Sequence, residues 1–364
     1  MKYQLKTITP VHIGTGETLS QIDGFYDNGQ WHRVDIDAML AAIPESDLNR
    51  LTIAMGQRDF QWRRYLPTNQ SSARYTLPCP EDPRETEIRE AMKTPSNRPM
   101  IPGSSIKGAI RTALLWDLIG DPDQEPFKYS VNYLKRKPNR SWVGQGIEQR
   151  VLGKDPNHDL MRAVQVSDTA PIPIEALEIG VAWTVTLNRN DRLVQKRQGN
   201  SEYKTFVEQI RAEQTFDFSI KIDKSLFGQR EKRELGFTAE QERVLCEEFA
   251  EACNFVAKGL ADSEANFFDA YYLDEIVNFY DALVRRIENL PDGAFVLPIG
   301  WGTGYRAKTV TELLTGDNDD LMRDLRRHYR LGRRHHPEFP KTRRVLYDRR
   351  RPQAPLGWVQ ITPV

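Results

Sequence analysis

The two ends of this 364-residue chain both have the pattern of a β-strand, and this constrains the fold more than any other feature. Residues 3–10 and 357–362 read as strands, whereas two long stretches between them, 238–260 and 264–290, have helical spacing. Strands at both ends, with helices and hairpins between them, favour an α+β sheet in which the termini pair. A regular βαβ repeat is disfavoured.

Shorter segments predict the elements between these ends. Asn28-Gly29, between two apolar runs, is a strong hairpin signal. Residues 120–156 are polar, with isolated aromatic residues, and we expect them to project from the core. The other expected segments are a glycine-containing loop at 14–16, helices in 35–57, turns in 67–83, a strand edge in 85–92, a hairpin in 189–204, and strands at 163–167, 179–188, 216–222 and 294–299.

These elements divide the chain into three parts. Residues 1–230 form the core, with insertions at about 35–80 (helical), 120–156 and 189–204 (projecting). Residues 231–292 form a helical subdomain, and residues 293–364 complete the core with a glycine-rich loop and a basic segment.

The net charge is zero, because 51 basic residues balance 51 acidic ones, but the charges are segregated. Residues 321–352 contain twelve bases against three carboxylates, and residues 234–292 contain fourteen carboxylates against four bases. The basic stretch suits nucleic-acid phosphates, and the acidic stretch suits solvent or a protein neighbour. The alternative, that the two stretches pair with each other, stays open.

Residues 101–111 predict a turn that runs into a helix. The Pro-Gly pair ends the preceding element, and Ser104 and Ser105 are expected to cap the helix, whose free N–H groups favour anions. Lys107 and Arg111 are four residues apart and therefore project from one side. An adjoining apolar stripe can face a core; its members are Ile106, Ile110, Leu114 and Leu118. The motif suits a phosphate backbone, although an ordinary amphipathic helix with a solvated Lys and Arg has the same pattern.

The glycine-rich loop at 300–309 follows an apolar strand and ends in Lys-Thr. It is not the phosphate cradle of nucleotide hydrolases, which needs Gly directly before Lys, where this chain has Ala307. With Arg306 and Lys308 nearby, it is still suited to phosphate contact. The alternative is a purely structural tight turn.

Catalytic and metal sites have weaker support. Asp23 could act as the base of a metal-free RNA endonuclease, but a turn-capping carboxylate is the favoured interpretation. Ser104 and Lys107 fit the S-x-x-K motif of serine acyl-enzymes, whose other two motifs each miss one residue here. Neither the His335-His336 pair nor the three cysteines have metal-ligand spacing, so no metal is expected.

The sequence also predicts a cytoplasmic protein with no membrane contact. No run approaches the roughly 18 apolar residues of a spanning helix. The first residues alternate polar and apolar side chains and lack the core of a signal peptide.

The run I-P-G-S-S-I-K-G-A-I-R-T-A-L at 101–114 resembles the signature of the RAMP superfamily of CRISPR-associated proteins. Further matches, in order along the chain, are similar to the family of the fifth subunit of type III-A Csm complexes. They are L-K-T-I-T-P-V-H-I-G-T-G at 5–16, D-L-M-R at 159–162 with V-S-D at 166–168, the glycine-rich loop, F-P-K-T-R at 339–343 and P-L-G-W-V at 355–359.

This resemblance implies an RRM-like (ferredoxin-like) core with a glycine-rich loop, inserted hairpins and a helical subdomain. It also implies a non-catalytic, crRNA-binding subunit that caps the backbone filament at the 3′ side of the crRNA and supports its 3′-end maturation. The implied partners are crRNA, the adjacent repeating RAMP backbone subunit, the small helical subunit and a recruited host nuclease. No cofactor is implied.

The expected site is an RNA groove with no catalytic residue, and RNA cleavage at Asp23 is the competing hypothesis. The predicted RNA-binding residues are His12, Gly14, Gly16, Ser104, Ser105, Lys107, Gly108, Arg111, Arg162, Gly302, Thr303, Gly304, Arg306, Lys308, Lys341, Arg343 and Arg344.

Overall fold

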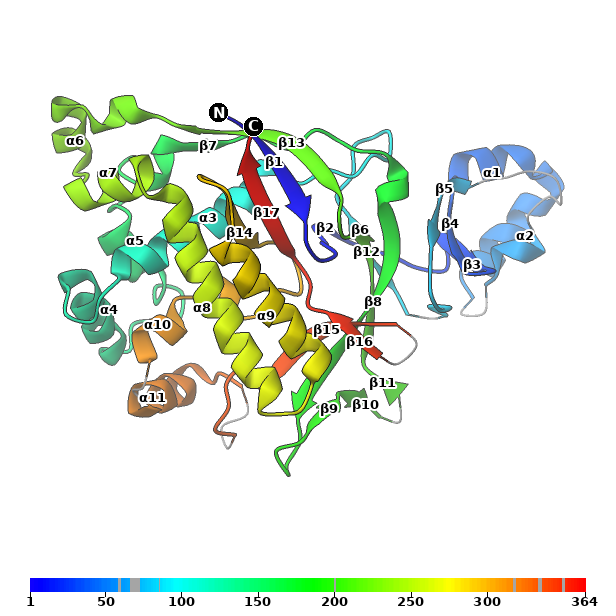
Figure 1. Ribbon diagram of the computed structural model, residues 1–364. Helices are drawn as coiled ribbons and strands as arrows, with labels where there is room; N and C mark the ends of the chain where they lie inside the picture. Colours follow the sequence, from blue (N-terminus) through cyan, green and yellow to red (C-terminus); the bar gives the residue numbers. More distant parts are fainter. Residues whose placement is uncertain are drawn as a thin grey trace.

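The computed structural model describes residues 1–57, 60–65, 73–84, 86–199, 201–316, 319–332, 336–348 and 351–364. The fold is α+β, with two large sheets and helices packed against them (Figure 1). In the described part of the chain, no helix is both long and apolar enough to cross a membrane.

The first sheet has five strands in the order β14-β17-β1-β13-β7. They are β1 (Lys2–Thr7), β7 (Val164–Val166), β13 (Thr215–Ile222), β14 (Phe295–Pro298) and β17 (Trp358–Pro363). β1 is antiparallel to both of its neighbours, β13 and β17. The predicted pairing of the two termini is therefore confirmed, and both ends emerge side by side in Figure 1.

The connections of this sheet give an RRM-like core. Helix α3 (Gly103–Ile119) lies between β1 and β7 in sequence, and helices α7 (Ala239–Cys246), α8 (Phe249–Asp269) and α9 (Asp274–Glu288) lie between β13 and β14. Leaving β14 aside as an added edge strand, the strands β17-β1-β13-β7 have the order 4-1-3-2 of a βαββαβ unit. The predicted fold class is confirmed.

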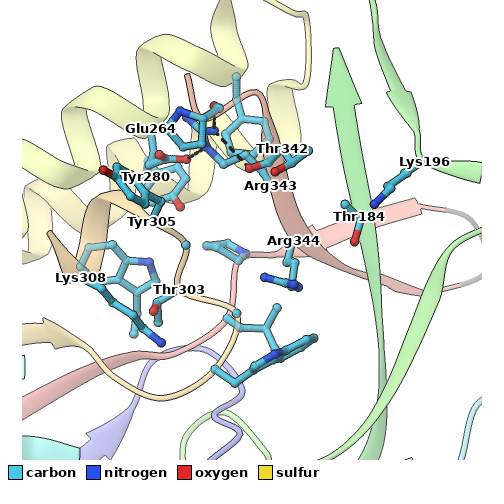
Figure 2. Close-up of a pocket in the computed structure, with 18 of the residues that line it drawn as sticks. Thr184, Lys196, Glu264, Tyr280, Thr303, Tyr305, Lys308, Thr342, Arg343 and Arg344 are labelled. Atoms are coloured by element: carbon cyan, nitrogen blue, oxygen red, sulfur yellow. Dashed lines mark hydrogen bonds and ion pairs between the residues drawn. The ribbon is translucent and has the colours of Figure 1, made fainter. Parts of the chain in front are cut away.

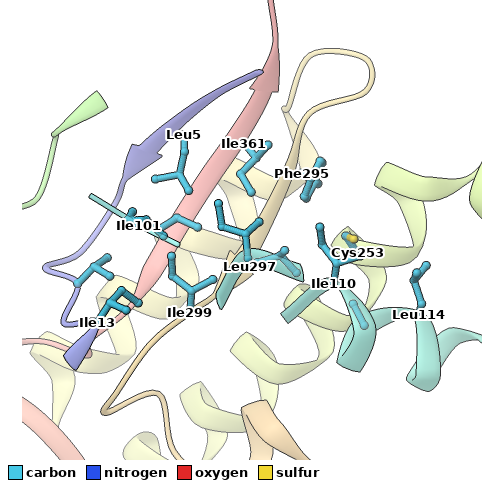
Figure 3. Packing of buried hydrophobic residues seen from close by; sticks show 14 of the residues in the cluster. Leu5, Ile13, Ile101, Ile110, Leu114, Cys253, Phe295, Leu297, Ile299 and Ile361 are labelled. Carbon is cyan, nitrogen blue, oxygen red and sulfur yellow. The ribbon is translucent and has the colours of Figure 1, made fainter. Parts of the chain in front are cut away.

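The main core lies between this sheet and helices α3 and α8. Leu5, Phe295 and Ile361 from the strands pack in one cluster with Ile110 of α3 and Cys253 of α8 (Figure 3). The predicted apolar stripe of α3 is buried, because its members recur every three or four residues along one helix face. The stripe comprises Ile106, Ile110, Leu114 and Leu118.

The second sheet has the order β16-β15-β8-β12-β6-β2, and β9 also pairs with β8. Its strands are β2 (Gly14–Leu19), β6 (Ile88–Ala91), β8 (Leu177–Leu187), β9 (Leu193–Gln195), β12 (Lys204–Ile210), β15 (Thr342–Asp348) and β16 (Arg351–Ala354). The pair β10 (Arg197–Gln198) and β11 (Ser201–Glu202) extends the predicted 189–204 hairpin, which we call the hairpin arm. Two predictions were wrong. Residues 14–16, expected as a loop, lie in β2, and the strand edge expected at 85–92 is β6, which lies inside the sheet between β12 and β2.

A small unit projects beside the second sheet (Figure 1). It contains β3 (Gly24–Asp27), β4 (Gln30–Val34), β5 (Ala73–Pro78), α1 (Ile36–Ala42), α2 (Glu45–Met55) and η1 (Trp62–Arg64). The predicted hairpin is confirmed, with Asn28 and Gly29 at φ 45° and 80°. The unit has its own core of Val34, Met39, Leu51, Phe60 and Trp62. The expected turns at 67–83 were wrong over β5, and residues 66–72 lie outside the described ranges.

Residues 120–156 do not project. They form α4 (Glu125–Lys135) and α5 (Gln145–Val151), and Leu134, Ile147 and Leu152 join the main core. Their polar composition reflects the outer faces of two short helices. The remaining elements are η2 (Leu160–Ala163), η3 (Ile174–Ala176), η4 (Lys224–Phe227), α6 (Gln229–Leu235), η5 (Arg306–Lys308), α10 (Thr311–Thr315) and α11 (Asp319–Tyr329).

Candidate nucleic-acid interface

The glycine-rich loop crosses one face of the second sheet and encloses a pocket of about 320 Å³ (Figure 2). The sheet supplies Thr184, Thr342 and Arg344, and the hairpin arm supplies Lys196 and Tyr203. The opposite wall is made by residues 301–305 of the loop and by Lys308 of η5. Three segments distant in sequence therefore form one site.

Glycine allows the loop to lie this close to the strands. Gly300 has φ 78°, and a Cβ there would lie 2.5 Å from the carbonyl oxygen of His12. Gly302 has φ 92° and faces Leu356. Because these conformations strongly disfavour L side chains, the spacing of the glycines fixes the path of the loop. The amide of Trp301 donates to the His12 carbonyl over 2.9 Å and anchors the loop to the strand end.

Trp301 of the loop packs against the second sheet. Its ring packs against the buried residues Ala182, Leu346 and Leu356. The guanidinium of Arg344 lies 4.6 Å from the ring centroid, and that of Arg89 lies 5.2 Å from it. Both arginines are partly exposed and lie within cation–π range of the indole.

Four cations at or beside the pocket have no carboxylate partners in the described ranges. Arg89, Lys196, Lys308 and Arg344 form no ion pair there. Burial, and then the charge of Arg344, lowers the pKa of Lys308. Burial, and then the charge of Arg89, lowers the pKa of Arg344. This mutual repulsion makes the surface favourable for an anion.

Of the described residues that line the pocket, Glu264 is the one carboxylate, and it is already paired. It accepts a hydrogen bond from Arg343, whose buried guanidinium also lies 3.9 Å from the ring centroid of Phe267. Arg306 lies 3.5 Å from Glu264 and also pairs with Glu312. The basic stretch 321–352 and the acidic stretch 234–292 therefore pair with each other at one point, through Arg343 and Glu264.

Several predicted RNA contacts are therefore committed within the protein. The guanidiniums of Arg306 and Arg343 are shielded by carboxylates, and Arg111 lies 2.8 Å from both Glu148 and Asp159. Because their charges are balanced internally, we remove these three arginines from the proposed interface. Sequence spacing did not reveal their distant acidic partners.

Two other predicted cations hold backbone carbonyls. The ammonium of Lys341 donates to the carbonyl of Leu187 over 2.8 Å, and the guanidinium of Arg162 donates to the carbonyl of Asn157. The first contact joins the segment before β15 to the end of β8, and the second joins η2 to the loop before it. Arg162 is nevertheless exposed, so its predicted contact with RNA remains a prediction.

His12 is buried and neutral rather than a cation on the surface. Burial lowers its pKa to about 4; a hydrogen bond to the Glu208 carbonyl opposes this shift, and the charges of Arg89 and Lys93 add to it. Its Nδ1 donates to that carbonyl over 2.7 Å, and its ring meets Trp301 edge-on at 5.9 Å. His12 therefore supports the loop instead of binding phosphate as a cation.

The start of α3 differs from its prediction. Pro102 occupies the N-cap position with no side-chain hydrogen bond, so Ser104 and Ser105 lie inside the helix and the predicted serine cap was wrong. The Gly103 amide donates to Asp168 Oδ1 over 2.7 Å. A protein carboxylate therefore already occupies this helix end. Ser104, an exposed residue, makes no hydrogen bond to a lysine in the described structure.

Other members of the predicted groove stay predictions. Lys107 has no ion-pair partner within the described ranges, and Gly108 has open space beside it. The indole Nε1 of Trp116 donates to the carbonyl of Thr309 over 2.8 Å, so α3 adjoins the end of the glycine-rich loop. Gly14 and Gly16 are exposed in β2, while Gly302, Thr303 and Gly304 lie at the pocket.

Asp23 has the structure of a turn-capping carboxylate. Its Oδ2 accepts hydrogen bonds from the amide and hydroxyl of Ser20 over 2.8 and 3.0 Å, and its Oδ1 lies 3.0 Å from Arg33. These contacts occupy the carboxylate and do not favour its use as a base. Among the described residues, no group of three His, Cys, Asp or Glu side chains could hold a metal ion. His335, Arg333, Arg334, Arg349 and Arg350, which belong to the histidine pair or the basic stretch, lie outside the described ranges.

The sequence interpretation missed Arg89, Lys196, Tyr203 and Trp301. Arg89 lies in a short strand and Lys196 lies in the hairpin arm, and neither has a motif around it. Trp301 lies inside the recognised loop, and an indole between glycines is the one available signal.

Comparison with known proteins agrees with this architecture. The sequence model of the RAMP superfamily matches residues 4–308. The CRISPR system Cms protein Csm5 of Methanocaldococcus jannaschii is 24% identical over 406 aligned positions, which cover 100% of this chain and 89% of that protein. Csm5 of Streptococcus thermophilus is 26% identical over 212 positions, which cover 52% of this chain and 57% of that protein.

Two solved structures share the fold. A chain of the cryo-EM structure of a Csm–crRNA–target RNA ternary complex in a type III-A CRISPR-Cas system has a TM-score of 0.78 at 22% identity, with 100% of each chain covered. The crystal structure of T. onnurineus Csm5 has a TM-score of 0.68 at 20% identity, with 98% of this chain and 99% of that chain covered. Since the family match spans most of its length, this chain belongs to the RAMP superfamily.

Proposed function

We propose that this chain is a crRNA-binding structural subunit of a type III-A Csm complex, in the position of Csm5. The observation that carries the proposal is a group of cations around the glycine-rich loop that have no ion pair among the described residues. The similarity to proteins named Csm5 and to a chain of a Csm–crRNA–target RNA complex supports the choice of ligand and assembly.

The chemistry of the site suits a phosphate backbone. Lys196, Lys308 and Arg344 come from three separate elements and converge on one groove without acidic partners in the described ranges. Contacts to phosphate position a strand but do not read its sequence. Binding is therefore expected to depend strongly on salt and weakly on base sequence.

The finer role is also part of the proposal. The subunit caps the backbone filament at the 3′ side of the crRNA, contacts the adjacent repeating RAMP subunit and the small helical subunit, and supports 3′-end maturation through a recruited nuclease. It works in the cytoplasm and has no catalytic residue of its own. The commitment of Asp23 to Ser20 and Arg33 supports a structural role over RNA cleavage.

The test compares two pairs of lysine substitutions in the full chain. Lys196→Gln/Lys308→Gln removes two charges from the groove, and the control Lys135→Gln/Lys154→Gln removes two exposed charges elsewhere. Affinity for a labelled single-stranded RNA is measured against salt concentration. The slope of log K against log salt is negative, and we call its magnitude the salt slope. The groove variant should reduce the salt slope by about 1.4, because each lost phosphate contact removes about 0.7 on a single strand. Equal slopes for the two pairs would overturn the proposal.

A further inference from the structure

Arg89 and Arg344 lie on the same face of the second sheet, although they are 255 positions apart in sequence. Arg344 is paired with Thr184 across β15 and β8, and Arg89 is paired with Val207 across β6 and β12. Val207 in turn faces Gly180, which shares a sheet face with Thr184 because side chains alternate along a strand. The strand register therefore places both arginine side chains on the same face of the second sheet.

Both guanidiniums lie close to the ring of Trp301. The distances from the ring centroid to the guanidinium carbons are 5.2 Å for Arg89 and 4.6 Å for Arg344, so the two carbons are at most about 10 Å apart. Each guanidinium is close enough to the ring for cation–π attraction. The indole packs against Ala182, Leu346 and Leu356. The backbone amide of Trp301 donates to the carbonyl of His12. The ring is therefore held at a fixed position beside both cations, where it also lines the pocket.

Neither guanidinium has an ion pair in the described structure, unlike Arg111 and Arg343, which have carboxylates of their own. Two positive charges held close together in this way repel each other. An anion at this position would relieve the repulsion. A stacked strand places one phosphate about every 3.4 Å along its axis, so a span of up to about 10 Å covers neighbouring phosphates.

We propose that Arg89 and Arg344, both positioned against the indole of Trp301, bind neighbouring phosphodiesters of single-stranded RNA. Trp301 is then a positioning residue and does not stack on a base. This inference rests on the proposed function, which it deepens by pairing Arg344 of the pocket with Arg89 beside it as contacts to neighbouring phosphates.

The test again uses the full chain, a labelled oligouridine and the salt dependence of its affinity. Arg89→Gln/Arg344→Gln should lower the salt slope by about 1.4 relative to the wild type. The control, Arg230→Gln, removes an exposed arginine on α6 and should leave the slope unchanged. An unchanged slope in the double variant would overturn the proposal.

The role of Trp301 has a separate readout. Trp301→Leu keeps an apolar side chain on the sheet but removes the aromatic ring, and it should lower the salt slope as the double arginine variant does. Trp301→Phe keeps an aromatic face and should retain most of the salt slope of the wild type. If Trp301→Leu weakens binding at an unchanged slope, a base stacks on the indole and the proposal is wrong. Thermal melting checks that each variant is folded.

The two proposals fail in different ways. If the wild type shows no salt-dependent RNA binding, both the proposed function and the arginine pair are overturned. If the lysine variants of the groove lower the slope but Arg89→Gln/Arg344→Gln does not, the RNA site stands and only the arginine pair is wrong.

Discussion

Alanine at two glycines of α3 should change the stability of the protein in opposite directions. Gly103 begins the helix, and a Cβ there would lie 2.4 Å from the carbonyl oxygen of Val166 and 2.7 Å from that of Ser167. Gly108 lies five residues later, and a Cβ there would meet nothing within 4 Å. The two substitutions add the same methyl group to the same helix and differ only in surroundings.

The magnitudes follow from these contacts. At Gly103 the backbone of α3 must move away from β7, at a cost of about 1–3 kcal/mol for overpacking. The movement also weakens the hydrogen bond from the Gly103 amide to the Asp168 carboxylate, a type of bond worth about 1.5–3 kcal/mol. We therefore expect Gly103→Ala to destabilise the protein by roughly 2–5 kcal/mol. Gly108→Ala should stabilise it by about 0.5–1 kcal/mol, because alanine restricts the unfolded chain.

Urea unfolding followed by circular dichroism measures both changes in the full chain. A Gly103→Ala protein as stable as the wild type would refute the reasoning, as would a destabilised Gly108→Ala protein. Gly108 also belongs to the predicted RNA contacts, so the second variant has another use. If its surface touches RNA, the added methyl group should weaken RNA binding even though it stabilises the fold.

Three further predictions concern buried or paired groups. Burial lowers the pKa of His12 from 6.5 to about 4, so the unfolded chain takes up the proton first as the pH falls. Stability should thus decrease from pH 6.5 to 4 by roughly 3 kcal/mol, and unfolding titrations should show that His12→Gln removes this part of the dependence. Glu264→Gln should cost about 3–5 kcal/mol in urea unfolding, because it leaves the buried guanidinium of Arg343 without its main partner. Labelled RNA should stay intact with the wild type, with or without Mg²⁺; cleavage that disappears in Asp23→Asn would contradict a structural role.

The fold was largely predictable because its strongest patterns are local. The terminal strands, the Asn28-Gly29 hairpin and the apolar stripe of α3 depend on residues a few positions apart, and each formed as expected. Residues 120–156 were misread because composition averages over a segment, while only a few of its side chains face α3. Leu134 and Ile147 are enough to bring that segment into the core.

The candidate site was harder to predict, since the value of a cation depends on what lies beside it. Arg111 finds its carboxylates at Glu148 and Asp159, and Arg343 finds its own at Glu264, far along the chain in each case. Conversely, Arg89 is notable because no carboxylate in the described ranges reaches it. Only the register of the sheet brings such residues together.

The neighbouring positions of β1 and β17 also affect how the chain must fold. β17 lies between β1 and β14, yet it is made after every other strand of that sheet. During synthesis, one edge of β1 therefore stays unpaired until the last strand arrives, and pairings between distant segments form slowly. A chain stopped shortly before residue 358 would expose two open strand edges in the middle of its main sheet, which are templates for aggregation. Residues 358–363 are in this sense the closing piece of the core, although they lie at the end of the sequence.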